Sequence, residues 1–334
     1  MNYAIHEQPA VIYRRPALRL VNTTQLSRQE WLDVRKHGLG SSDAAAAVGL
    51  NPYKSPLELW LEKTGRDAEL AKPDPNDTNS PVYWGTQLEP IVATAYTQQT
   101  GRKVRRVNAV LQHPEHPWML ANLDREVVGA NDVQILECKT AGEHGARLWK
   151  NGVPEYVHLQ VQHQLAVTGK AAADVAVLLH GQELQVHRIE RDNALIQTLI
   201  RLEARFWDYV TSVTPPPADG TASAASALQC LYPRDNGTEL DLSQDSNLSA
   251  LFMDLKEAKA QADKFKKLEE AFKQKLQEVL GEATKARFAS GSISWKRTAD
   301  TTVLDTKRLL ADQPQLLDQY GITRAGTRRF LVHA

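Results

Sequence analysis

The sequence predicts a mixed α/β protein, and three patterns indicate this class. Short runs rich in β-forming apolar residues and bounded by turn residues occur at 119–138 and 172–189, which is typical of paired strands. Around these runs, apolar residues recur at helical spacing behind Ser-Pro or Pro starts and before glycines, which predicts helices. A Thr-Pro-Pro-Pro segment at 214–217 is typical of a linker. We therefore expect an α/β core followed by a separate C-terminal part.

The composition is that of an ordinary globular protein. The 334 residues are 42% hydrophobic and 24% charged, and 40 Lys and Arg balance 40 Asp and Glu. Bulk charge therefore does not indicate a nucleic-acid partner, and any basic surface must be local. Two distant cysteines, Cys138 and Cys230, indicate a reducing compartment without a disulfide framework. Arg14, Arg15 and Arg19 interrupt the N-terminal region, so we expect neither a signal peptide nor a membrane span, and a cytoplasmic location.

The elements follow in order. Residues 1–22 lack a clean period and are expected to form a loose arm, and residues 23–213 form the expected core. Ser55-Pro56-Leu57-Glu58 is a capping box with proline at the first helical position. In chain order, helices are expected at 26–37, 56–65, 81–100, 153–168 and 193–213. Strands are expected at 103–111, 119–128, 133–138, 172–180 and 184–189.

The C-terminal part is expected to be separate. Residues 214–225 are the predicted linker, and residues 226–334 are predicted to form a helical or coiled-coil arm and a small α/β tail. A charged helix at 248–280 has apolar residues three and four apart until the pattern slips at Leu268. This favours a short coiled coil or a helical hairpin over a long zipper. In the tail, strands are expected at 293–297 and 328–332, on either side of a helix at 305–317.

The stretch 121–140 carries the clearest chemistry. Asp124 is expected in the first strand of a hairpin, and Glu137 and Lys139 lie two residues apart at the end of the second. Residues i and i+2 of a strand share a face, and a paired strand can bring Asp124 to that face. Two carboxylates and a lysine suit a hard divalent cation with the lysine beside its bound water. A solvated strand face with a cross-strand ion pair is the alternative, but the apolar run before Glu137 favours buried charges, which need a partner or a metal.

Other polar residues could serve such a site. The Gly/Ser loop 38–43, which contains Ser42, leads into a helix and offers N–H groups and hydroxyls to an anion, or only caps the helix. Glu89 precedes Pro90 beside the apolar face of helix 81–100, and an ordinary surface glutamate is the alternative. Gln160 and Gln164, four residues apart, can reach a phosphate or a water, or form a polar helix face. A local basic patch is made by Arg102, Lys103, Arg105 and Arg106.

These motifs together resemble a known family. In order and spacing, the chain resembles the YqaJ-type viral recombinases, relatives of phage lambda exonuclease among the restriction-endonuclease-like nucleases with a PD-(D/E)xK core. The resemblance covers roughly residues 26–213, and it rests on the ordered set more than on any single motif. The matching motifs are Arg35, Gly40-Ser41-Ser42-Asp43, Gly85-x-x-x-Glu89-Pro90, Asp124, Leu136-Glu137-Cys138-Lys139-Thr140 and Pro154-x-Tyr156-x-x-x-Gln160-Val161-Gln162.

The resemblance implies a mixed central sheet flanked by helices and a magnesium-dependent 5′–3′ exonuclease, with Mn²⁺ as a substitute. Its substrate would be linear double-stranded DNA, from which it would produce 3′ single-stranded tails for phage or prophage recombination. The resemblance also implies a homo-oligomer, in the form of a ring trimer, and a single-strand annealing protein as partner. The protein would act in the cytoplasm of a bacterial host cell.

Residue roles follow from the same resemblance. Asp124, Glu137 and the backbone carbonyl of Cys138 would hold the metal, and Glu89 is a further candidate ligand that would complete the catalytic site. Lys139 would orient the attacking water. Two further roles complete the set: Gln160 would lie near the scissile phosphate, and Arg35 and Ser42 would bind a terminal 5′-phosphate.

Two other functions stay open from the sequence. A related endonuclease that nicks DNA or cleaves junctions would use the same core, although Arg35 and Ser42 argue against it because end recognition needs a phosphate pocket. A non-catalytic DNA-end binding or recruitment protein is the other alternative, which the intact acidic positions disfavour.

Overall fold

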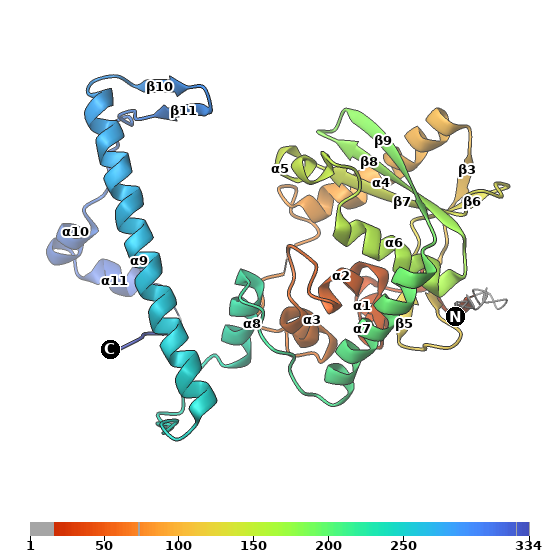
Figure 1. The fold of residues 1–334 in the computed structure, drawn as a ribbon, viewed down its shortest axis with the longest axis horizontal. Coiled ribbons are helices and arrows are strands. Elements are labelled where there is room, and N and C mark those ends of the chain that lie inside the picture. The colour runs from red at the N-terminus through yellow and green to blue at the C-terminus, as the bar shows by residue number, and fades with distance from the viewer. Residues whose placement is uncertain (1–16, 73, 325, 334) are drawn as a thin grey trace, which may run out of the picture. The chain divides into compact units, whose positions relative to one another are not determined.

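The computed structural model describes residues 17–72, 74–324 and 326–333, so Arg14, Arg15 and most of the expected loose arm lie outside the described residues. The chain divides into two units, Met1–Pro233 and Arg234–Ala334, each of which is described by itself. The first unit contains every candidate site residue. Its mixed α/β architecture, with helices flanking the sheets, confirms the expected fold class (Figure 1).

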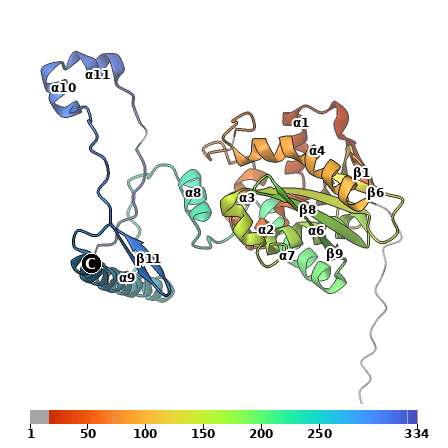
Figure 2. The same cartoon turned by 90° about the horizontal axis from the view of Figure 1, so that it is seen from above.

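A five-stranded sheet forms the centre of the first unit. Its strand order is β3-β6-β7-β8-β9, and among these neighbours only β7 and β8 run parallel. The parallel pair is joined through α6, which crosses one face of the sheet, whereas α4 covers the opposite face (Figure 2). The strands are β3 (Lys103–Arg105), β6 (Arg125–Val128), β7 (Ile135–Ala141), β8 (Ala172–Leu179) and β9 (Glu183–Glu190).

A second sheet corrects three expectations. Its order is β1-β4-β5-β2, and β1 pairs with β4, so Leu18–Asn22 is a strand and not part of a loose arm. The expected strands 103–111 and 119–128 are each divided between the two sheets, and the segments 106–108 and 122–124, which separate their two parts, belong to no strand. The strands of this sheet are β1 (Leu18–Asn22), β2 (Leu39–Gly40), β4 (Ala109–Gln112) and β5 (Met119–Ala121).

The helices of the first unit agree closely with the sequence pattern. Helix α4 begins at Pro81 behind the Ser80 cap and ends at Gly101, whose positive φ of 71° suits a residue without a Cβ. The Ser55 side chain caps α3 as expected, and α1, expected from residue 26, begins at Arg28 behind a Ser27 cap. The bounds are α1 (Arg28–Lys36), α2 (Ala44–Ala47), α3 (Pro56–Lys63), α4 (Pro81–Thr100), α5 (Glu143–Ala146), α6 (Glu155–Thr168), α7 (Asn193–Thr211) and α8 (Ala222–Leu231). Short 3₁₀ turns occupy Thr23–Gln25, Ser41–Asp43 and Arg147–Trp149.

Because of helix α8, the first unit ends later in the chain than the sequence predicted. Its Ala224 and Ala227 are buried, and Ser223 Oγ accepts a hydrogen bond of 2.7 Å from the backbone N–H of Ser55 at the start of α3. Residues 222–231 therefore belong to the first unit. The boundary falls at residue 233, later than the expected linker at 214–225.

The second unit contains one long helix and short elements. Helix α9 (Ser246–Leu280) is uninterrupted and leaves many apolar side chains exposed, so residues 248–280 do not fold back as a hairpin. The hairpin of β10 (Lys285–Phe288) and β11 (Gly291–Ser294) replaces the strand expected at 293–297, and α10 (Thr306–Asp312) and α11 (Gln315–Tyr320) occupy the expected helical region. The described residues 328–332 form no strand. No helix in the described ranges has the length and apolar content required to cross a membrane.

A buried ion pair ties α6 to its neighbours. His163 Nδ1 lies 2.8 Å from Glu203 Oε1 on α7, and Nε2 lies 3.0 Å from the carbonyl oxygen of Leu120. Since a carbonyl only accepts, Nε2 carries a proton. Burial disfavours the charged ring, but Glu203 outweighs burial and raises the pKa of His163 above its ordinary value.

We expect this pair to make stability depend on pH. The raised pKa of His163 contributes stability that is present below pH 6.5 and is lost as pH rises through the pKa of the folded state. His163→Leu should cost about 3–5 kcal/mol of unfolding free energy, because it leaves a buried carboxylate unpaired. Denaturant unfolding at pH 6 and pH 9 measures both effects. A double variant, His163→Leu with Glu203→Leu, should recover most of the loss, and an equal loss in the double variant would contradict the pairing.

Candidate active site

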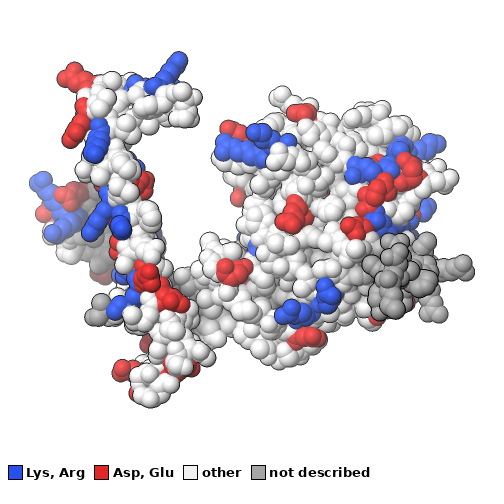
Figure 3. Space-filling view, viewed as in Figure 1, with Lys and Arg blue, Asp and Glu red and all other residues white. Residues whose placement is uncertain are grey.

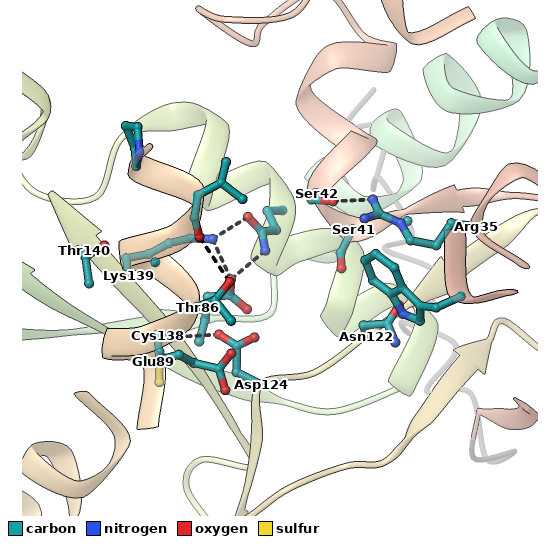
Figure 4. A pocket seen from close by; sticks show the side chains of 17 residues that line it. Arg35, Ser41, Ser42, Thr86, Glu89, Asn122, Asp124, Cys138, Lys139 and Thr140 are labelled. Carbon is teal, nitrogen blue, oxygen red and sulfur yellow. Dashed lines mark hydrogen bonds and ion pairs between the residues drawn. The ribbon is translucent and has the colours of Figure 1, made fainter. Parts of the chain in front are cut away.

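All eight site residues expected from the sequence line one pocket of about 580 Å³. They come from α1, the 3₁₀ turn at 41–43, α4, the β5–β6 connection, β7 and α6, so segments more than 100 residues apart in sequence meet here (Figure 4). The residues are Arg35, Ser42, Glu89, Asp124, Glu137, Cys138, Lys139 and Gln160. Their proximity is a property of the fold, whereas their chemical roles stay predictions.

Strand β7 places Glu137 and Lys139 on the face of the sheet that α6 covers. Ile135 packs into the cluster on the α6 side and Leu136 into the cluster on the α4 side, so the period of two puts Glu137 and Lys139 beside α6. Lys139 Nζ donates to Glu137 Oε1 at 2.6 Å and to Gln160 Oε1 at 2.9 Å. The shared face expected for the two charges is thus present.

Two glutamine amides hold the Glu137 carboxylate. Gln160 Nε2 donates to its Oε1 at 2.6 Å, and Gln164 Nε2 donates to its Oε2 at 2.7 Å. Gln164 is fully buried, and its own Oε1 has no hydrogen-bond partner within the described part of the chain. The i,i+4 spacing on α6 therefore fixes a nearly buried carboxylate by its two oxygens.

Asp124 lies in the β5–β6 connection and not inside a strand as expected. Its Oδ2 accepts a hydrogen bond of 2.8 Å from the backbone N–H of Cys138. Burial, and next the negative charge of Glu137, raise the pKa of Asp124 to about 8, although Lys139 and the Cys138 N–H partly offset this. Asp124 is therefore easier to protonate because it shares the pocket with a second carboxylate, Glu137.

Glu89 is held by a cation that the sequence did not suggest. Arg125 Nη1 donates to Glu89 Oε1 at 2.5 Å and to the carbonyl oxygen of Asp124 at 2.6 Å. Helix α4 brings the Glu89 carboxylate beside Asp124 (Figure 4). Because Arg125 occupies one of its oxygens, Glu89 is less available as a ligand than Asp124 or Glu137.

The donor set suits a hard cation. Within the described ranges, no three His, Cys, Asp or Glu side chains form a ready metal cluster. Asp124 and Glu137 are nonetheless desolvated carboxylates of the same pocket, and Asp124 carries a pKa raised by burial and by Glu137. A bound cation would favour both ionised forms, and oxygen donors are those that Mg²⁺ prefers. The residues present therefore fit a divalent ion held by two carboxylates.

Lys139 keeps its charge in this surrounding. Burial disfavours the ammonium, but Glu137 and Asp124 outweigh burial and raise the pKa of Lys139 above its ordinary value. Lys139 is thus a hydrogen-bond donor at neutral pH and not a base. Burial, and next Asp124 and Glu137, also raise the pKa of the Cys138 thiol, which makes it an unreactive neutral group.

The other end of the pocket carries cationic side chains. Arg35 Nη2 donates to Ser42 Oγ at 2.7 Å and to Asp43 Oδ1 at 3.1 Å, and its guanidinium lies 4.8 Å from the Trp31 ring centre. Lys63 Nζ donates to Asp43 Oδ2 at 2.6 Å. Burial acts to raise the pKa of Asp43, but Lys63 and Arg35 outweigh burial and hold it well below its usual range. Two cations against one carboxylate leave a net positive charge beside Ser42.

Several residues of the site were not anticipated. Lys63 bonds Asp43, Arg125 binds Glu89, and Asn122 lines the pocket beside Asp124. Asp43 was part of a matching motif, but its bond to Arg35 was not expected. Asn122 and Asp124 share the i,i+2 spacing, which could have indicated it. Arg125 and Lys63 carry no local signal, because their partners lie 36 and 20 residues away.

Together the fold and the site define an α/β protein whose mixed sheet presents carboxylates and a lysine to a pocket with a cationic end. The YqaJ-like viral recombinase domain matches residues 30–171. The uncharacterized protein YqaJ of Bacillus subtilis (strain 168) is 40% identical over 228 residues, which cover 67% of this chain and 69% of that protein. The chain belongs to the family of the YqaJ-like viral recombinase domain.

Two solved structures are also similar to part of the chain. An alkaline exonuclease (LHK-Exo) from Laribacter hongkongensis matches at 23% identity with a TM-score of 0.47, over 56% of this chain and 94% of that one. A phage-related exonuclease from Haemophilus somnus 129PT matches at 12% identity with a TM-score of 0.38, over 55% of this chain and 99% of that one. The family assignment rests on the sequence matches and not on these structures.

Proposed function

We propose that this protein is a metal-dependent exonuclease that degrades one strand of linear double-stranded DNA from its 5′ end and leaves a 3′ single-stranded tail. One observation carries the proposal. A single pocket contains the buried carboxylates with Lys139 and, at its other end, the Arg35–Ser42 pair. An enzyme that hydrolyses the bond next to a terminal phosphate needs both parts within reach of one strand.

Asp124 and Glu137 would hold Mg²⁺ together with the backbone carbonyl of Cys138, and Glu89 is a further candidate ligand. The ion, when bound, would lower the pKa of a water molecule and stabilise charge on the phosphate oxygens. Lys139 would donate a hydrogen bond to the attacking water and so orient it. Gln160 and Gln164 keep the Glu137 carboxylate in one orientation, which limits the reorganisation needed during reaction.

The test uses linear and closed circular duplexes of the same sequence with Mg²⁺. We expect degradation of the linear form only, and release of a 5′ label before a 3′ label. Cleavage of the closed circle would favour the related endonuclease. DNA binding without hydrolysis in Mg²⁺ or Mn²⁺ would contradict the proposed enzymatic activity and favour a DNA-end binding protein.

Arg35 gives a separate prediction. Arg35→Gln removes the cation that faces Ser42, so we expect the preference for a 5′-phosphate over a 5′-hydroxyl end to fall about tenfold. Initial rates on the two ends, compared for Arg35→Gln and wild type, measure it. Arg66→Gln is a control, because Arg66 lies outside the pocket, stacks on Trp60 and should leave the preference unchanged. An unaltered ratio in Arg35→Gln would contradict the phosphate role.

The family resemblance supports two further parts of the proposal. The protein would form a ring trimer and hand its 3′ tails to a single-strand annealing protein during phage or prophage recombination in a bacterial cytoplasm. Sedimentation equilibrium of the full chain tests the first part, and a monomer at micromolar concentration would exclude it.

A further inference from the structure

The carboxylate pocket adjoins further pockets that Arg35 and Ser42 do not line. A second pocket of about 310 Å³ shares Glu89 and Asp124 with the first. A third pocket of about 350 Å³ shares Arg106 and Arg125 with the second. The three pockets therefore adjoin one another, and the carboxylates lie where the first two meet.

The adjoining pockets follow one helix. The first is lined by the α4 residues between 81 and 89, the second by those between 86 and 90, and the third by those between 90 and 98. At about 1.5 Å of rise per residue, this part of α4 is about 26 Å long. That length accommodates several nucleotides at about 3.4 Å each. We call the second and third pockets together the α4 groove.

The far end of the α4 groove suits an anion. The third pocket has Arg106, Arg125, Thr94, Thr97 and Gln98 among its lining residues and has no Asp or Glu in its lining. It is thus cationic and polar, in contrast to the acidic centre between it and Arg35. On the face shown in Figure 3, Lys and Arg side chains lie among Asp and Glu side chains.

Arg106 differs from the other two arginines of the basic patch. Arg102 pairs with Asp132 at 2.8 Å, and Arg105 pairs with Glu126 at 2.6 Å. Arg106 is exposed, and no ion pair within the described residues involves it. Its charge is therefore available to a ligand in the α4 groove.

We propose that the strand beyond the scissile bond lies along the α4 groove, with Arg106 binding one of its phosphodiesters. The inference rests on the proposed function. In the proposed function the terminal phosphate binds at Arg35 and the reacting phosphate binds at the carboxylates. The rest of the strand then leaves the first pocket past the carboxylates, where the α4 groove begins. There Arg106 offers the guanidinium fork that suits a phosphate. The ligand of the α4 groove is thus the backbone of the hydrolysed strand, without sequence preference.

The test compares Arg106→Gln with Arg105→Gln, which makes the same charge change one residue away and outside the α4 groove. Fluorescence anisotropy of a 5′-phosphorylated duplex in EDTA, over a range of salt concentrations, measures binding. For Arg106→Gln we expect binding about fivefold to tenfold weaker in 0.1 M salt, and a slope of log K against log salt smaller by about 0.7–0.9, the value of one phosphate contact. For Arg105→Gln we expect neither change.

A second readout separates a strand contact from a disturbed site. At saturating DNA and Mg²⁺, the first turnover of Arg106→Gln should stay within about twofold of wild type. Equal salt slopes in the two variants, or a loss confined to the saturating rate, would overturn the inference while leaving the exonuclease proposal standing. Conversely, the protein could bind DNA with a salt slope that depends on Arg106 and yet not hydrolyse it. That result would support DNA binding in the α4 groove and contradict the exonuclease proposal.

Discussion

Asp124→Asn is expected to reduce metal-dependent DNA degradation by at least about 10³-fold without destabilising the metal-free protein. The amide can still accept the Cys138 N–H hydrogen bond but cannot supply the charge that holds a cation. A loss of about 4 kcal/mol of transition-state stabilisation corresponds to this factor. Initial rates on a linear duplex measure the effect. Glu69→Gln is the control, because Glu69 is exposed and lies outside the pocket.

Stability provides the second part of this test. The pKa of Asp124 is raised to about 8 in the folded protein, by burial and then by Glu137, so the folded state binds more protons than the unfolded state between pH 4 and pH 8. Stability in EDTA should therefore decline as pH rises through this range. The stability of Asp124→Asn should decline less over this range, and its melting temperature at pH 8 should be higher than that of wild type. Retained activity within tenfold, or a lower melting temperature at pH 8, would contradict this account of Asp124.

Lys139→Met is expected to lower the rate by about 10²–10⁴-fold, the range for a positioned side chain that assists proton transfer or orients a reactant. The methionine keeps most of the volume of the side chain but removes the ammonium that bonds Glu137 and Gln160. Glu137 remains held by Gln160 and Gln164, so the fold should persist. Single-turnover rates at saturating DNA measure the chemical step.

The Lys139 prediction has its own controls. Lys139→Arg keeps a cation and should recover part of the loss, although its planar fork cannot occupy the same position. Binding of a 5′-phosphorylated duplex in EDTA should stay unchanged in both variants, because in the proposed function Arg35 and Ser42, and not Lys139, would bind the terminal phosphate. A methionine variant whose rate falls less than threefold would remove Lys139 from the catalytic group.

Local sequence determined most of the helices and the chemistry of the site. Ser80, Pro81 and Gly101 set the ends of α4 through capping and backbone constraints that act within a few residues. The period of two in β7 put Glu137 and Lys139 on one face for the same reason. The ordered motifs from Arg35 to Gln160 could be recognised because each one is contiguous in the chain.

Interactions between remote segments decided what the pattern left open. The single strand expected at 119–128 became β5 and β6 in different sheets, because strand pairing depends on partners elsewhere in the chain. This division took Asp124 out of a strand and placed it under the Cys138 N–H. The α8 helix joined the first unit through α3, which moved the boundary to residue 233.

By itself the sequence determined which side chains are the candidates for chemistry in this protein, namely the carboxylates, Lys139, the glutamines of α6 and the Arg35–Ser42 pair. Only the tertiary structure decided how they are balanced: Glu89 is bound by Arg125, Arg35 is braced by Asp43, and Arg106 is left unpaired at the end of the α4 groove. The physical reason is the distance along the chain over which each kind of interaction acts. Helix caps and strand periodicity act over a few residues, whereas charge compensation in a pocket depends on groups that come together only when the chain has folded.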